Sequence, residues 1–198
     1  MKQSSQSREK LISEARNFII ERGFSAMSVS DVCSAAGVTK GSFFHHFVSK
    51  ESLGEAVLDE FWQNVQHRQE LAEFKKLADP IAKVRGYVDH AIEIYQDPMA
   101  RSGCLLAIYT AELKETHPKL FSKCVPYFHA WKEDLQSLIE EASNQLPANV
   151  SFNSQSWAEL YISTLEGALI LAKALDDPQI ISRTLALYRN QLISNLSA

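Results

Sequence analysis

Apolar residues recur at helical spacing along almost the whole of this sequence, and no segment shows the strict alternation of a β-strand. One such stripe lies near the N-terminus, ends at Gly23, and consists of Leu11, Ile12, Ala15, Phe18 and Ile19. Further stripes, separated by glycine and proline, continue to the C-terminal residues. The pattern predicts an all-α protein of about nine helices.

Two short helices joined by a glycine-containing turn are predicted between residues 28 and 46. Ser28 and Asp31 have the spacing of a capping box, and they begin a helix that Gly37 ends. Thr39 can cap a second helix that runs to about His46. With the helix before Gly23, this pair predicts an N-terminal helix-turn-helix DNA-binding domain over residues 1–50.

The second helix of this pair has barely two turns and cannot bury much by itself. Its apolar residues Val38, Phe43 and Phe47 suffice to hold it against the two preceding helices. The other side presents hydrogen-bond donors, a small residue and a ring that can contact a thymine methyl: Lys40, Gly41, Ser42, Phe44, His45 and His46. Such a face suits a DNA major groove, although a solvated polar face, and a packing role for Phe44, are the plain alternatives.

Charge is distributed unevenly along the chain. Residues 1–54 hold seven Lys or Arg against five Asp or Glu, whereas residues 55–198 hold thirteen against nineteen, within an overall net charge of −4. A small DNA-facing head on an acidic body fits this asymmetry.

The sequence GVTKGSFFHHF at residues 37–47, followed by SKE at residues 49–51, resembles the signature of the TetR family of one-component bacterial repressors. The resemblance covers about the first quarter of the chain. It implies that Lys40, Gly41, Ser42 and Phe44 face bases and that His45, His46 and Lys50 reach phosphates. It also places Ser28 and Ser30 near the DNA backbone, and Thr39 joins them as a residue at a helix start.

Two positions depart from the family pattern. The family usually has Tyr at the position of Phe44 and often Pro at the position of Val48. Because Phe44 lacks the hydroxyl that can bind phosphate, we expect a lower DNA affinity but the same fold.

Residues 51–198 are predicted to form a helical effector-binding and dimerisation domain. Its first helices are expected at 50–72, 80–95 and 102–116, with a break at Asp97 and Pro98. A further helix over 118–145 contains Pro126, which either kinks or splits it, and residues 147–154 form a loop.

The last two expected helices carry the prediction of assembly. Between Leu160 and Leu175 only Glu166 and Lys173 are charged, so this eighth helix must be buried on more than one side. The ninth helix, residues 178–196, adds an apolar stripe, and Gly167 with Ala168 would allow close approach of a partner helix; the stripe is Ile181, Leu185, Tyr188 and Leu192. We therefore expect a homodimer formed by helices eight and nine, which is also where the resembled family dimerises, and a palindromic DNA operator.

A regulator also needs an input, and ring-bearing residues of the central helices are candidates. They could line an effector cavity with few polar anchors: Trp62, Tyr87, His90, Tyr109, Phe128 and Trp131. Core packing is the simpler reading for any one of them. The resembled family usually binds its small-molecule effector between helices four and seven, and binding there would change the spacing of the two DNA-binding heads.

Cys104 is a second candidate for the input. The sequence SGCL at residues 102–105, followed by AEL at residues 111–113, is similar to a branch of the family that includes sensors of reactive electrophiles. A cysteine near a helix N-terminus can have a lowered thiol pKa, and Lys173 is a candidate neighbour; the alternative is a small buried hydrophobic residue. Cys33 and Cys124 are expected to be packing residues.

The remaining features define the class of protein. With 45% apolar residues the chain can bury a full-sized core, and it contains no run of apolar residues long enough for a bilayer. The polar N-terminal residues do not resemble a signal peptide, and three cysteines without C-x-x-C spacing fit neither a disulfide framework nor a zinc site. We expect a cytoplasmic protein without membrane contact, metal or cofactor.

No phosphate-binding loop, nucleophile elbow or paired metal-ligand spacing is present, so catalysis is not expected. The sequence predicts a DNA-binding transcriptional repressor that a small apolar or reactive effector releases from its operator. The alternative is a helical protein-interaction module without specific DNA binding, which would not explain the polar face of residues 40–46.

Overall fold

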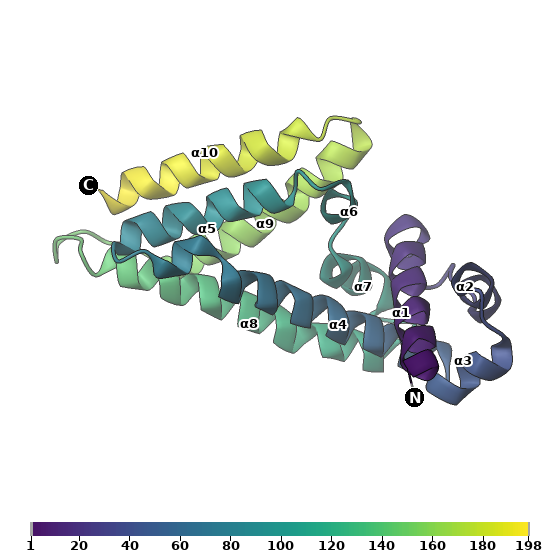
Figure 1. The fold of residues 1–198 in the computed structure, drawn as a ribbon. Helices are drawn as coiled ribbons and strands as arrows, with labels where there is room; N and C mark the ends of the chain where they lie inside the picture. The colour runs from purple at the N-terminus through teal and green to yellow at the C-terminus, as the bar shows by residue number, and fades with distance from the viewer. Residues whose placement is uncertain (1, 198) are drawn as a thin grey trace. The chain divides into compact units, whose positions relative to one another are not determined.

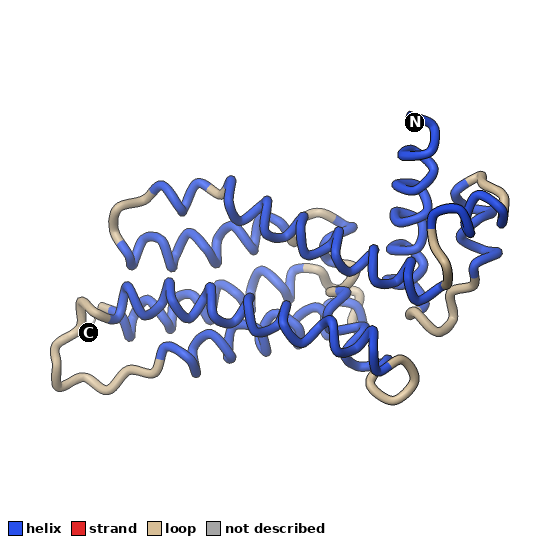
Figure 2. Tube along the Cα trace, turned by 90° about the horizontal axis from the view of Figure 1, so that it is seen from below, coloured by secondary structure: helices blue, strands red, loops and turns tan. Residues whose placement is uncertain are grey.

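The computed structural model describes residues 2–197 and contains only helices, turns and loops over that range (Figure 1, Figure 2). This confirms the predicted all-α class. The ten α-helices and one 3-10 turn of this part of the chain are α1 (Lys2–Arg22), α2 (Val29–Ala36), α3 (Lys40–His46), α4 (Lys50–Leu71), η1 (Glu73–Lys76), α5 (Pro80–Ile94), α6 (Pro98–Arg101), α7 (Leu105–Leu113), α8 (Pro118–Ser143), α9 (Ser154–Ala174) and α10 (Gln179–Leu196).

The chain forms two compact units. Unit 1 comprises Met1–Gln66 with Leu105–Tyr127, and unit 2 comprises His67–Cys104 with Phe128–Ala198. The helix-turn-helix segment lies wholly within unit 1, together with α7 and the first turns of α8. Residues 51–198 are divided between the two units.

The predicted caps of the helix-turn-helix segment are confirmed. Ser28 caps α2 by accepting a hydrogen bond from the Asp31 backbone N–H at 3.1 Å, and Gly37 ends α2 with a φ of 65°. Thr39 caps α3 by accepting from the Ser42 N–H at 3.1 Å. These caps fix where α3 begins, and therefore which of its side chains face outward.

The segment around residue 100 differs from the prediction of one helix over 102–116. Asp97 caps the short helix α6 by accepting from the Met99 N–H at 2.9 Å, so the Asp97-Pro98 pair begins a helix as well as breaking one. Gly103 then takes a φ of 151°, which interrupts the helical backbone before α7. The helix expected over 102–116 is therefore the shorter α7, and α6 is an additional helix that precedes the expected range.

Pro126 lies inside α8, which is continuous over its 26 residues. Of the two alternatives, splitting of this helix is excluded. A proline removes only one backbone donor, and the surrounding turns maintain their own hydrogen bonds.

Unit 2 is built around α5, α9 and α10, and α10 lies alongside both other helices (Figure 1). Its core includes the fully or almost fully buried Val88, Leu165 and Leu185. An ion pair between Arg189 and Asp89 joins α10 to α5. These contacts hold the three helices together.

The three cysteines are buried and form no disulfide within the described range. Burial raises the pKa of Cys124 to about 11, and it also raises the pKa of Cys33. Both properties are those of the packing residues expected for these two positions. None of the described helices has the length and apolar character needed to cross a membrane.

Candidate DNA interface and effector region

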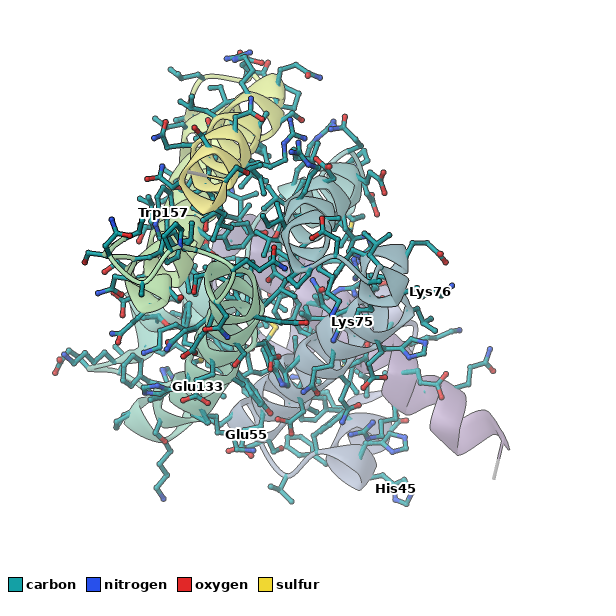
Figure 3. The ribbon with its side chains drawn as sticks, turned by 90° about the vertical axis from the view of Figure 1, so that its left-hand side faces the viewer. His45, Glu55, Lys75, Lys76, Glu133 and Trp157 are labelled. Atoms are coloured by element: carbon teal, nitrogen blue, oxygen red, sulfur yellow. The ribbon has the colours of Figure 1, made fainter. Side chains whose placement is uncertain are left out.

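The candidate DNA-contacting surface is the outer side of α3. Phe43 and Phe47 are 0% and 4% exposed and fix the helix to its neighbours, as predicted. Lys40, Gly41 and His45 are exposed on α3, and the His45 side chain projects outward in Figure 3. The buried rings therefore orient a polar face toward the surroundings.

Phe44 does not pack into the core. Its side chain is 58% exposed, and its ring meets the Phe43 ring edge-on with 5.2 Å between centroids. An exposed ring held by a buried one is a rigid apolar contact of the kind that can meet a thymine methyl.

The remaining predicted DNA contacts also lie at the surface of this head. Ser28, Ser30 and Thr39 are exposed, and Ser42 and His46 are half-buried. The hydroxyls of Ser28 and Thr39 already serve as helix caps, so these two residues hold the surface in shape whether or not they contact DNA.

Arg8 adds positive charge to this surface, and the sequence did not reveal it. Its guanidinium carbon lies 5.4 Å from the centroid of the Phe47 ring. Burial lowers the pKa of His46, and the nearby charges of His45 and Arg8 lower it further. Arg8, His45 and His46 therefore form one basic cluster at the end of α3.

The ammonium group of Lys50 already makes contacts within the protein. Its Nζ donates a hydrogen bond to the Ser25 carbonyl at 3.1 Å and lies 4.5 Å over the Phe24 ring. Burial lowers its pKa, while Glu51 and Glu112 act in the opposite direction. An ammonium has three donors, so the contact with Ser25 leaves capacity for a phosphate.

Glu112 has a structural role that sequence reasoning missed. It lies on α7 and accepts hydrogen bonds from the backbone N–H groups of Phe24 at 2.8 Å and Ser25 at 2.7 Å. The loop between α1 and α2 is therefore held by a residue that is 87 positions distant from Ser25 in the chain. Such a contact has no local sequence signal.

Four of the predicted effector residues lie in unit 2 within an aromatic region. The Trp131 Nε1 donates to the Tyr87 hydroxyl at 3.0 Å, and Phe128 stacks on Trp131 with 6.3 Å between centroids. The Phe74 ring contacts both Tyr87 and His90, with ring centroids 5.6 Å and 6.0 Å apart, respectively. The structure therefore places Tyr87, Phe128 and Trp131 together, with His90 linked to them through Phe74.

His90 carries an unsatisfied polar atom in this region. Its Nε2 is buried and has no hydrogen-bond partner among the described residues, and the same holds for the Oε1 atoms of Gln69 and Glu166 elsewhere in unit 2. A buried polar atom without a partner is costly, so a bound molecule that supplies one would gain from it.

Trp62 and Tyr109 belong to unit 1 instead. Tyr109 is 0% exposed and donates to the Gly54 carbonyl at 3.1 Å, and Trp62 stacks on Tyr127 with 5.1 Å between centroids. Both side chains have defined packing roles there, which favours core packing over effector binding for each of them.

Cys104 contacts Glu166 rather than Lys173. The thiol is 6% exposed and hydrogen-bonds the Glu166 carboxyl, whose pKa is raised by burial although this contact opposes the shift. Lys173 is exposed two turns further along α9. The expected pairing with a lysine is therefore corrected, because a carboxyl occupies the place beside the sulfur and disfavours a second negative charge there.

No cluster in the described part of the chain has the three or more His, Cys, Asp or Glu side chains that could hold a metal ion. The sequence matches two family models of known regulators. Residues 11–57 match the family described as bacterial regulatory proteins, tetR family, and residues 80–188 match the tetracyclin repressor-like C-terminal domain. The second match alone covers more than half of the chain.

The chain belongs to the TetR family. The HTH-type transcriptional repressor DhaR of Mycobacterium sp. (strain GP1) is 27% identical over 166 residues, which cover 84% of this chain and 82% of DhaR. The repressor NemR of Escherichia coli K12 is 31% identical over 113 residues, which cover 54% of this chain and 53% of NemR.

Solved structures of TetR-family proteins share the fold. A regulator from Agrobacterium tumefaciens has a TM-score of 0.84 at 20% identity and covers 95% of this chain and 98% of its own. The reduced form of E. coli NemR has a TM-score of 0.74 at 24% identity and covers 93% and 96%. As a TetR-family member, the protein is a DNA-binding transcriptional regulator and not an enzyme, as predicted.

Proposed function

We propose that this TetR-family protein is a homodimeric repressor that binds a palindromic operator through α3 of each protomer and is released by a small effector. The observation that carries the proposal is the exposed polar face of α3 above the buried Phe43 and Phe47. The DhaR and NemR relatives, both named as repressors, support the sign of regulation.

Base reading and backbone binding are assigned to different residues of this face. Lys40, Gly41, Ser42 and Phe44 contact bases, because they lie on the first turns of α3, which dock into the major groove in helix-turn-helix proteins. His45, His46, Lys50 and the newly recognised Arg8 bind phosphates. Ser28, Ser30 and Thr39 lie against the DNA backbone at the helix starts.

Dimerisation is assigned to α9 and α10, the eighth and ninth helices expected from the sequence. Large apolar side chains remain exposed on them: Leu160 49%, Ile170 68%, Leu171 51%, Leu175 66% and Leu187 70%. A Cβ atom added at Gly167 would meet nothing within 4 Å, which leaves room for a partner helix. An apolar surface of this kind is typical of an oligomer interface.

The effector is assigned to the aromatic region of unit 2, with Tyr87, His90, Phe128 and Trp131 as contacts. Aromatic walls with the unsatisfied His90 Nε2 suit a largely apolar molecule that carries a hydrogen-bonding group.

Cys104 is a second candidate input, favoured by the likeness to NemR and opposed by its burial and its Glu166 neighbour. Cys104→Ser that leaves the response to quinones, aldehydes and hypochlorite unchanged would eliminate this second input.

Fluorescence anisotropy on DNA selected by the protein from random sequence, and on scrambled DNA, tests the proposal. We expect tight binding to the selected DNA alone, weakening by at least about a hundredfold between about 50 and 200 mM salt. A module that binds only proteins would select no DNA and show no such preference. Compounds are then screened for release of the labelled DNA.

A further inference from the structure

We propose that Glu112 is a positioning residue for DNA binding, which fixes the α1–α2 loop to α7 and thereby sets the half-site spacing that the two DNA-binding heads accept. The inference rests on the proposed function in one respect, that two heads bind one palindromic operator. Glu112 itself touches no DNA.

The carboxylate serves two backbone donors at once. Its Oε2 accepts from the Phe24 N–H at 2.8 Å, and its Oε1 accepts from the Ser25 N–H at 2.7 Å. Because α1 ends at Arg22 and α2 begins at Val29, both amides lie outside any helix and need a partner from elsewhere. Hydrogen bonds to an ionised carboxylate are short and strong, so the loop is held firmly.

Gly23 is shaped to admit this carboxylate. Its φ is +83°, a conformation that favours glycine, and a Cβ at this position would lie 2.8 Å from the Glu112 Oε2. The loop conformation and the missing side chain both fit an approach from α7. This observation is independent of the hydrogen bonds.

Other contacts hold the same loop against the start of α4. Phe24 is 0% exposed, and its ring meets the Tyr109 ring at 5.8 Å between centroids. At Gly54 an added Cβ would lie 2.5 Å from the Phe24 ring, so α4 also leaves space for it. Lys50 reaches the Ser25 carbonyl from the same helix. The loop that leads into α2 is therefore fixed from two helices.

The charge of Glu112 persists at neutral pH. Burial alone would raise the pKa of its carboxyl, but the hydrogen bonds from Ser25 and Phe24 and the charge of Lys50 outweigh burial and lower the pKa. Because the carboxylate stays ionised, its two hydrogen bonds hold the loop against α7 at neutral pH.

Glu112→Gln is the informative variant, with Glu115→Gln as its matched control. Glutamine preserves the size of the side chain but offers only one acceptor oxygen, and its NH2 group faces a backbone N–H. Glu115 lies just beyond the end of α7, is exposed, and gives the same change in net charge.

Binding is measured by anisotropy on the operator selected by the wild type, and on operators with two base pairs inserted between the half-sites. Two extra base pairs rotate one half-site by about 70°. We expect the wild type and Glu115→Gln to lose about tenfold or more in affinity, and Glu112→Gln to lose less than about threefold, with base preference inside each half-site unchanged. Equal discrimination in Glu112→Gln and the wild type would overturn the inference.

Hydrogen exchange of the Phe24 and Ser25 amides separates this inference from the proposed function. A wild type without any spacing preference would refute the two-headed operator, and the exchange data then decide alone about Glu112. Faster exchange of both amides in Glu112→Gln, but not in Glu115→Gln, supports the role of Glu112 in holding the loop, and unchanged exchange refutes it. Glu112→Asp, which keeps the charge but is too short to reach both amides, gives the same answer if the glutamine variant does not fold.

Discussion

The guanidinium of Arg8, near the start of α1, lies 5.4 Å over the ring of Phe47, which directly follows α3. The Phe47 ring is buried, so the cation is held at the end of the recognition helix. This contact brings a charge from the first helix to the surface that we propose contacts DNA.

Arg8→Ala is expected to weaken binding to specific and random DNA alike and to reduce the salt slope by about one for each protomer. A phosphate contact carries no sequence information, so both DNAs lose it equally. Lys75→Ala, which removes the same charge from η1 in unit 2 (Figure 3), is the control and should leave the slope unchanged. An unchanged slope in Arg8→Ala would remove Arg8 from the interface.

Lys40→Ala and Lys50→Ala should differ in which DNA they bind less tightly. Lys40 is exposed at the first position of α3, so its loss should weaken the selected operator by about 1–3 kcal/mol and random DNA less. Lys50→Ala should weaken both DNAs similarly. Affinities of both variants on selected and scrambled DNA test this, and parallel losses in the two variants would refute the division.

The affinity for DNA should rise as the pH falls below 7. The pKa of His46 lies below its usual 6.5 in the protein alone, so the imidazole is mostly neutral at pH 7. A nearby phosphate favours the protonated form, so binding takes up a proton and strengthens by at most about tenfold per pH unit for each such group. His46→Gln should reduce this pH dependence, whereas His129→Gln, an exposed histidine of α8, should not. Titration of the affinity from pH 7.5 to about 5.5 measures the effect.

Aspartate placed on the apolar surface of α9 and α10 should separate the protomers. Ile170→Asp with Leu187→Asp introduces charges at side chains that are 68% and 70% exposed in the single chain, so folding of the protomer is little affected. Size-exclusion chromatography with light scattering should give 22.3 kDa for this variant and twice that mass for the wild type. Leu71→Asp, at an equally exposed leucine of α4, should remain dimeric. A wild type that is monomeric at micromolar concentration would refute the interface.

The contribution of Glu112 to stability should depend on pH. Its pKa is lower in the folded protein than the ordinary value of 4.5, so its stabilisation is fully present above pH 4.5 and is lost as the pH falls through the folded pKa. At pH 7 we expect Glu112→Gln to lower the free energy of unfolding by about 2 kcal/mol. Urea denaturation of both proteins at one concentration should show this difference at pH 7 and 5 and a smaller one at pH 3. A difference that grows in acid would contradict the ionised contact.

The exposed polar face of α3 could be predicted from the sequence because its determinants are local. The caps at Ser28 and Thr39 and the glycine at Gly37 set the ends of α2 and α3, and the spacing of Phe43 and Phe47 sets the buried side. Once these are fixed, the exposure of the remaining α3 residues follows from the geometry of a helix.

The residues that position this surface could not be predicted in the same way. Arg8 and Glu112 act through contacts with Phe47 and with the loop at Phe24, which are tertiary and leave no periodic signal. A lone arginine or glutamate on a predicted helix has the same appearance as a solvated one. The effector prediction grouped ring-bearing positions of several helices by residue type, and the structure places Tyr109 in unit 1, where its hydroxyl donates to the Gly54 carbonyl.

Unit 1 includes Leu105–Tyr127 as well as the helix-turn-helix, and this has a consequence for protein engineering. A chimera that transplants residues 1–50 onto another regulator carries the loop at Phe24 without Glu112 and Tyr109, the groups that cover it. Its two amides would lack acceptors and its ring would need a new pocket. The smallest portable DNA-reading cassette of this protein is therefore discontinuous in sequence, and a grafted head must bring α7 with it.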